Sequence, residues 1–228
     1  MQIADQLERD IIGGRYTSGD WIREQDIADR LGTSRGPVRE ALRLVELDGL
    51  IEMVPWRGAR VVAMSAPELD DLMEVVAALQ GLVARLAAVH ANETAFDQVE
   101  ALVDQMEATI IQVQPMGRQL RLAFETGALL REVCGSDRAG AMLMKVGRLA
   151  YWQHRYLLQA DRRWRVAAIR KWRALVAALR VRDGERADRA ARDMVHHSKS
   201  YIMRVLAKGV MMPLPDELPA RMESVGTR

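Results

Sequence analysis

The sequence predicts a mainly α-helical protein with two parts: a small N-terminal domain of three helices and a β-hairpin, and an all-helical C-terminal bundle. Ala, Leu, Arg and Glu are abundant and aromatic residues make up only 5% of the chain, a composition typical of helices. The length of 228 residues favours two domains. Two short β-branched runs around a turn lie before residue 64, and apolar residues at helical spacing continue to residue 208.

The first two helices are predicted from apolar residues that share one helix face. The first covers 2–12 and ends at Gly13-Gly14. A turn with a short extended piece, RYTSGDWI, follows it. The second covers 24–32, with Gly32 at the position of a C-cap. The apolar faces carry Ile3, Leu7 and Ile11 in the first helix and Ile27, Ala28 and Leu31 in the second.

The third helix starts inside the segment TSRGPVREAL, although a Gly-Pro pair usually interrupts helices. Ser34 is placed to cap the first turn through its hydroxyl group. Pro37 then falls at the third helical position, where its missing N–H removes no helical hydrogen bond. The apolar stripe comprises Val38, Ala41, Leu42 and Val45, and Gly49 ends the helix. The segment 50–62, LIEMVPWRGARVV, then predicts a β-hairpin.

One face of the third helix is predicted to be strongly basic. At about 100° per residue, Arg35, Arg39 and Arg43 fall at about 0°, 40° and 80°, beside Gly36. A guanidinium group can donate two hydrogen bonds to guanine O6 and N7, and a helix N-terminus attracts phosphate. The absence of a side chain at Gly36 would let a DNA strand approach closely. For this helix alone, an ordinary solvated face with arginines paired to glutamates (Glu40 and Glu46) is the alternative.

The order of helix, turn, basic helix and hairpin is that of a winged helix-turn-helix, with Arg57 and Gly58 at the tip of the wing. These tip residues would touch the minor groove or phosphates. Residues 1–64 nevertheless contain nine Arg and eleven Asp or Glu, a net charge of −2. DNA affinity must therefore come from a local stripe of arginines, and a second copy of the domain would increase it.

Residues 1–62 resemble the winged helix-turn-helix of the GntR family of bacterial transcription regulators. The resemblance lies in SGDWIREQDIADRLGTSRGPVREALRLVELDGLI and in PWRGARV. It implies that Arg35 and Arg39 contact operator bases and phosphates and that Arg57 and Gly58 form the wing tip. It also makes a phosphate contact by Arg23 plausible. The predicted DNA-binding residues are Arg23, Ser34, Arg35, Gly36, Arg39, Arg43, Arg57 and Gly58.

The rest of the chain predicts long helices and an irregular tail. Ser65 and Glu68 have the spacing of a capping box at the boundary between the domains, 1–64 and 66–208. The tail, 209–228, contains three prolines. Helices are predicted near 66–92, 94–113, 119–133, 137–160, 163–182 and 185–208.

This half resembles the effector-binding and dimerisation domain of the FadR branch of the family, the FCD-type domain. The matching stretches are LQGLVARLAAVHA, LAFETGALLREVCGSDRAGAML and WRALVAALRVRDGERADRAARDMVHHS. A count of six helices suggests the shorter, VanR-like version.

Many members of this branch hold a divalent metal through an Asp, a His four residues later, and two further His residues. In this sequence Arg121, Glu125 and Trp172 occupy three of these positions, and only His197 (or its neighbour His196) keeps an imidazole. One imidazole cannot hold a metal in a site built for four ligands. The familial metal site is therefore predicted to be absent, with no cofactor in its place.

Several residues of this half are candidates for contacting an effector. Arg121 and Glu125, four residues apart, would sense a charged metabolite or simply pair with each other. Trp152 and Trp172 would line a cavity or pack in the core, and Arg148 would hold an effector carboxylate. The predicted effector-binding residues are Arg121, Glu125, Arg148, Trp152, Trp172 and His197.

Together these features predict a ligand-responsive bacterial transcription regulator, a repressor that binds a pseudo-palindromic operator as a homodimer. Its effector would be a small molecule such as an organic or sugar acid. The alternative is a DNA-binding regulator with a degenerate C-terminal pocket and no effector. An enzyme is not predicted, because no nucleophile or acid–base constellation occurs apart from Arg121 and Glu125.

The location predicted for the protein is the cytoplasm. The charged start MQIADQLERD lacks the apolar core of a signal peptide, and the single cysteine, Cys134, allows no internal disulfide. No unbroken run of 18 apolar residues would span a membrane.

Overall fold

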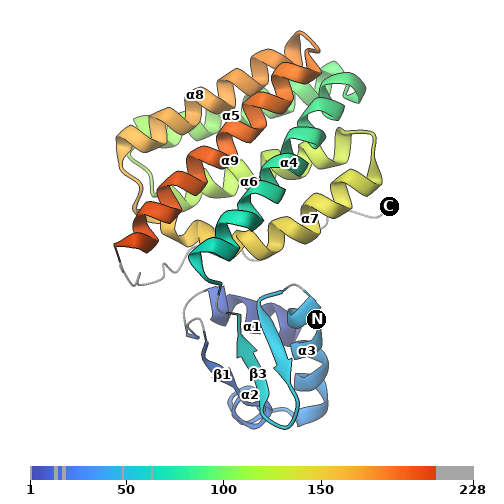
Figure 1. Cartoon of the computed structure of the whole chain (residues 1–228), viewed down its shortest axis with the longest axis vertical. Helices are drawn as coiled ribbons and strands as arrows, with labels where there is room; N and C mark the ends of the chain where they lie inside the picture. Colours follow the sequence, from blue (N-terminus) through green and yellow to red (C-terminus); the bar gives the residue numbers. More distant parts are fainter. Residues whose placement is uncertain (1, 13–14, 17–18, 48, 63, 209–228) are drawn as a thin grey trace. The chain divides into compact units, whose positions relative to one another are not determined.

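The computed structural model describes residues 2–12, 15–16, 19–47, 49–62 and 64–208, which form two compact units (Figure 1). The first unit extends to Ser65 and the second begins at Ala66. The predicted tail, 209–228, and the predicted helix stop at Gly13-Gly14 lie outside the described residues.

Three helices build the core of the first unit. They are α1 (Gln2–Ile12), α2 (Glu24–Leu31) and α3 (Arg35–Leu47). All four predicted stripe residues of α3 are buried, and they pack with side chains of α1 and α2. Gly32 ends α2 in the left-handed conformation, with φ +62°, as the C-cap prediction requires. The predicted apolar faces of this unit are therefore confirmed, except that Ile3 is only half-buried and Leu31 remains 36% exposed.

A three-stranded antiparallel sheet covers these helices at one side of the unit. The strands are β1 (Trp21–Ile22), β2 (Ile51–Val54) and β3 (Gly58–Val61), in the order β1-β3-β2. β2 and β3 form the predicted hairpin, with Val54 opposite Gly58 at the turn. The short extended piece predicted before the second helix becomes β1, which pairs with β3. The sheet therefore ties the wing to the segment that leads into α2.

The second unit consists entirely of helices joined by short turns (Figure 1). They are α4 (Ala66–His90), α5 (Glu93–Ile111), α6 (Met116–Val133), α7 (Asp137–Tyr151), the 3-10 helix η1 (Trp152–Gln159), α8 (Arg162–Arg180) and α9 (Gly184–Ala207). Side-chain oxygens cap three of the starts: Asn92 accepts from the backbone N–H of Ala95, Asp161 from that of Trp164, and Asp183 from that of Arg186.

Two predicted boundaries of this unit were wrong. The single helix predicted over 137–160 changes at Trp152 from an α-helix to the 3-10 helix η1. Gln153 and Tyr156 are both buried, and their spacing of three residues matches the three residues per turn of a 3-10 helix. The helix predicted from residue 119 begins at Met116, which is buried in its first turn.

Helix α4 is the central helix of the second unit. It packs most extensively on α9 and also contacts α6, α7 and α8. The approach to α9 is close: a Cβ added to Gly81 of α4 would lie 2.6 Å from Oδ1 of Asp188. By length and composition α4 is the one described helix able to cross a membrane, but core helices of bundles pass the same test.

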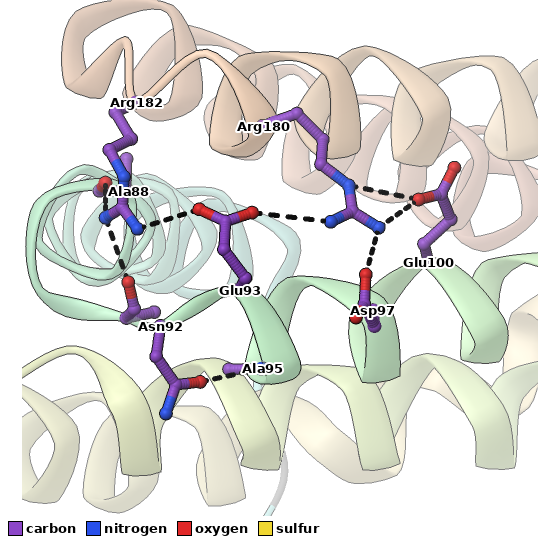
Figure 2. A network of polar contacts seen from close by, with 9 residues as sticks. Ala88, Asn92, Glu93, Ala95, Asp97, Glu100, Arg180 and Arg182 are labelled. Carbon is purple, nitrogen blue, oxygen red and sulfur yellow. Dashed lines mark hydrogen bonds and ion pairs between the residues drawn. The ribbon is translucent and has the colours of Figure 1, made fainter.

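A group of arginines at the end of α8 fastens α8 to α4 and α5 (Figure 2). Nη2 of Arg180 lies 2.6 Å from Oδ1 of Asp97, and its Nε donates to Glu100. Arg182 donates from Nη1 to the carbonyl oxygen of Ala91 at 2.9 Å and from Nη2 to Glu93 at 3.0 Å. Because Arg182 also lies near the carbonyls that end α4, it neutralises the negative end of that helix.

Candidate nucleic-acid interface and ligand region

The solvent-facing side of α3 presents the three predicted arginines. Arg35, Arg39 and Arg43 are all exposed, while the opposite side of the helix is buried in the core of the first unit. The helix begins at Arg35, so Ser34 directly precedes it and Pro37 occupies the third helical position. The N-terminal turn of α3 is therefore accessible, with its free N–H groups and positive dipole end available to a phosphate.

The three arginines differ in their partners. Arg39 is held by Glu24, the first residue of α2, through two hydrogen bonds of 2.7 Å. Arg43 forms an exposed ion pair of 2.9 Å with Glu40. None of the ion pairs among the described residues involves Arg35. Arg35 is therefore the guanidinium group of this face that is ready to bind without exchanging a partner.

The structure agrees only in part with the alternative that the arginines of α3 pair with Glu40 and Glu46. Arg43 pairs with Glu40 as that alternative expects. Glu46 does not pair with an arginine: its Oε1 accepts a hydrogen bond from the backbone N–H of Met53 at 2.7 Å, which links α3 to β2. The acidic residues of α3 therefore pair with one of its three face arginines, Arg43, and Glu24 of α2 pairs with Arg39.

Gly36 has no structural reason to be a glycine. It is exposed in the first turn of α3, and a Cβ added there would meet no atom within 4 Å. Glycine costs helix stability relative to alanine, since it loses more conformational entropy on folding. An external reason, such as the close approach of a partner, accounts for this residue better than the fold does.

The wing turn contains Pro55, Trp56 and Arg57, all of them exposed. Trp56 is fully exposed (103%) and has a positive φ of 67°, unusual for a residue other than glycine. Gly58, which was predicted to contact DNA, has a structural role: its φ is +96°, and a Cβ there would lie 2.8 Å from the carbonyl oxygen of Ile22. Arg57 and Trp56 are thus the wing residues with side chains available to a partner.

Arg23 lies between β1 and α2, with an exposed side chain. Its position just before α2 places it in the same segment as Glu24. The structure therefore distributes the predicted DNA-binding residues over the first turn and outer face of α3, the start of α2, and the wing turn.

In the second unit, the structure does not bring Arg121 and Glu125 into the interior. Both side chains are exposed on α6, and no ion pair among the described residues joins them. The same helix buries Leu120, Leu122 and Thr126 instead. The spacing of Arg121 and Glu125 places them on one face of α6, but the sequence pattern did not predict which face of α6 packs in the bundle.

His197 of α9 lies against Trp164 of α8. The two rings stack with centroids 4.7 Å apart and planes 11° from parallel, and His197 Nε2 lies 3.3 Å from the Trp164 carbonyl oxygen. Burial lowers the pKa of the His197 imidazole, which keeps it neutral at pH 7. Its neighbour His196 instead faces the surface, where it pairs with Glu74 of α4.

The other predicted effector residues are spread over three elements. Trp172 is half-buried on α8, and Arg148 is half-buried near the end of α7. The side chain of Trp152, at the start of η1, lies outside the described residues.

The residues at the familial metal positions do not fit a divalent cation. Arg121 carries a positive charge, the indole of Trp172 has no lone pair for a metal, and the retained imidazole of His197 is stacked on Trp164. Within the described part of the chain, no three His, Cys, Asp or Glu side chains gather as a metal site would need.

The sequence predicted Arg148 as an effector residue but not Arg131 of α6, whose guanidinium feels the charge of Arg148. Arg131 of α6 is half-buried, and burial lowers the pKa of its guanidinium, as does the positive charge of nearby Arg148. None of the ion pairs among the described residues involves Arg131. An anion bound near Arg131 would stabilise its partly buried positive charge.

Comparison with known families agrees with these two units. Residues 1–61 match the model for bacterial regulatory proteins of the GntR family, and residues 71–197 match the FCD domain. The chain belongs to the GntR family, in its FCD-containing branch. The resemblance inferred from the sequence is thereby confirmed, and this family consists of regulators rather than enzymes.

Similar proteins carry regulator names. The chain is 32% identical over 93 residues to the HTH-type transcriptional regulator YdhC of Bacillus subtilis, covering 41% of this chain and 42% of YdhC. It is 37% identical over 94 residues to the "Probable D-xylose utilization operon transcriptional repressor" of Paenarthrobacter nicotinovorans, with 41% and 42% covered. These alignments span about two fifths of each relative.

A solved structure supports the fold over nearly the whole chain. McbR/YncC of E. coli superposes with a TM-score of 0.73 at 18% identity, covering 90% of this chain and 97% of its own. At this level of identity the similarity speaks for the fold alone. The fold of this chain is therefore shared with a solved structure.

Proposed function

We propose that this GntR-family protein is a cytoplasmic transcription repressor that binds a pseudo-palindromic operator as a homodimer through α3. The observation that carries this proposal is the exposed arginine face of α3, which begins at an accessible helix N-terminus. Such a face supplies donors for guanine edges and phosphates in the major groove. The name of the Paenarthrobacter relative supports repression rather than activation.

The charge balance of the first unit supports a dimer. Residues 1–64 carry nine Arg against eleven Asp or Glu, so overall charge does not attract DNA to one copy. Two copies on half-sites about one helical turn apart would add their local arginine contacts. We therefore expect sedimentation at twice the mass of the 25.7 kDa chain.

The DNA-binding proposal is tested with a duplex selected by the protein from a random-sequence library. Binding to it should weaken steeply with salt, because each neutralised phosphate releases a counterion. Arg35→Ala should cost about 1–3 kcal/mol of binding free energy if the guanidinium contacts a base. Arg170→Ala, which removes an exposed arginine of α8, is the matched control and should bind like wild type. Failure to select any sequence would refute the proposal.

We further propose that the FCD unit responds to a small carboxylate, an organic or sugar acid. The half-buried Arg131 supports this, because none of the ion pairs among the described residues involves it and a carboxylate can accept paired hydrogen bonds from its guanidinium. Effector binding would change operator affinity only by its differential affinity for the two arrangements of the dimer.

A thermal-shift screen of organic and sugar acids tests this second proposal. A ligand that binds only the folded state raises the unfolding midpoint, and the rise should be lost in Arg131→Met. Arg138→Met, on the exposed side of α7, is the control. No shift with any acid would favour the alternative, a regulator without a small-molecule effector.

The absence of the familial metal remains a prediction with its own measurement. Elemental analysis of the purified protein should find no stoichiometric divalent metal. A tightly bound zinc, nickel or manganese ion would contradict the role assigned to Arg121, Glu125 and Trp172.

A further inference from the structure

The pairing between Glu24 and Arg39 joins the two helices of the helix-turn-helix. Nε of Arg39 donates to Oε1 of Glu24, and Nη2 donates to Oε2, both at 2.7 Å. This two-bond geometry fixes the plane of the guanidinium group as well as its position. Among the described residues it is the one ion pair between α2 and α3.

The two partners are unequally exposed. The side chain of Glu24 is only 16% exposed, whereas that of Arg39 is 52% exposed. The carboxylate therefore lies toward the protein and the guanidinium toward solvent. The hydrogen bond from Arg39 lowers the pKa of Glu24, so the carboxylate is charged at neutral pH.

Arg39 keeps N–H donors that Glu24 does not bind. A guanidinium has five N–H donors, and Glu24 occupies the Nε–H and one N–H of Nη2. One N–H of Nη1 and the second N–H of Nη2 point in parallel from the end of the group that Glu24 does not contact. This end is the fork that matches guanine O6 and N7, or two phosphate oxygens.

We propose that Glu24 is a positioning residue of the DNA-reading surface, which holds Arg39 by one edge so that its free fork faces the operator. The proposal rests on the DNA-binding function proposed above. Because the side chain of Arg39 is already ordered, less conformational entropy is lost when DNA binds. An acidic residue thus improves the binding of a polyanion, which charge alone would not predict.

The opposite reading treats Glu24 as a competitor that occupies Arg39 until DNA displaces it. The two readings predict opposite signs when the charge is removed. If Glu24 only repels or competes, Glu24→Gln should bind all DNA more tightly. If Glu24 positions Arg39, the same change should weaken selected DNA while leaving non-specific DNA unchanged or bound more tightly.

The test measures fluorescence anisotropy with two labelled duplexes: the library-selected duplex and a scrambled duplex of equal composition. For Glu24→Gln we expect about a tenfold loss of affinity for the selected duplex and a similar fall in the ratio of the two affinities, a typical size for one bidentate base contact. In the Arg39→Ala background, Glu24→Gln should have no further effect on the selected duplex. Glu40→Gln, which removes an exposed carboxylate from α3, is the matched control and should not lower the ratio.

A second measurement uses the wild-type protein, so its outcome does not depend on whether a variant folds. The NMR signal of the Arg39 Nε–H should stay protected from exchange with water after the selected duplex is added. Loss of that protection, or a Glu24→Gln variant whose affinity ratio equals that of Glu40→Gln, would overturn the proposal. If the wild-type protein selects no duplex at all, the DNA-binding function itself fails, which is a distinct outcome.

Discussion

Replacing Gly36 by alanine separates the needs of the fold from the needs of DNA binding. A Cβ at this position meets no atom within 4 Å, so the substitution adds no clash inside the protein. Alanine in a helix is more stable than glycine by about 0.5–1 kcal/mol. We therefore expect Gly36→Ala to stabilise α3 by up to that amount.

The same substitution should weaken DNA binding. If a DNA strand approaches the first turn of α3, the added methyl group would push it away from the donors of that turn. Loss of one such contact corresponds to about 1–3 kcal/mol, or about 5- to 150-fold in affinity. Gly36→Ala should thus be more stable and bind more weakly.

Two assays read these effects independently. Hydrogen exchange of peptides from 35–47 reports the local stability of α3, and fluorescence anisotropy with the selected duplex reports affinity. Gly147→Ala is the matched control, because Gly147 lies in helix α7 and a Cβ there also meets nothing within 4 Å. Gly36→Ala binding within twofold of wild type would refute the reasoning that assigns this glycine to DNA.

Substitutions at four further positions test other parts of the structure. Trp56→Ala should lower operator affinity several-fold without changing thermal stability, since the indole is fully exposed; equal affinity would remove Trp56 from the interface. Gly58→Ala should destabilise the sheet by about 2 kcal/mol or more, because of its positive φ and the contact with the carbonyl of β1; unchanged hydrogen exchange of β3 would contradict this. Arg182→Ala should lower the free energy of unfolding, measured in urea, by about 1–2 kcal/mol, because the hydrogen bonds of the guanidinium are lost. Arg182→Gly should lower it less, because glycine relieves the positive φ of 55° at this position. The reverse order would argue against backbone strain at residue 182. Burial lowers the pKa of His197 below its unfolded value of about 6.5, so protonation favours unfolding and the stability of the protein falls as the pH drops below about 6.5. In His197→Phe the melting temperature should therefore fall less between pH 7.5 and 5.5. An equally steep fall would exclude His197 as its source.

Local chemistry made most of the first unit predictable from its sequence. The start of α3 depends on residues next to each other: Ser34 before the helix, and Pro37 at a position where no helical bond is lost. The buried stripe of α3 follows from a periodicity of 3.6 residues, and the hairpin from its turn. Each of these signals lies within about a dozen residues of the feature that it specifies.

The second unit shows where local signals end. Periodicity indicated six helices, but a 3-10 helix and an α-helix look alike in an apolar pattern, so the change at Trp152 was missed. The spacing of Arg121 and Glu125 is correct for a pair on one face, yet the packing of α6 on α5 leaves both of them exposed. Which face of a helix is buried depends on its neighbours when several faces are partly apolar.

The sequence by itself determined that Arg35, Arg39 and Arg43 share one face of a helix, because side-chain directions in a helix follow from spacing alone. Only the tertiary structure decided that Glu24, 15 residues before Arg39, holds that arginine by one edge. It also decided that a side chain at position 58 would collide with the carbonyl oxygen of Ile22, so the fold itself requires a glycine there. Such contacts depend on how α2, α3 and the sheet pack against each other, and no local pattern of residues encodes that distance.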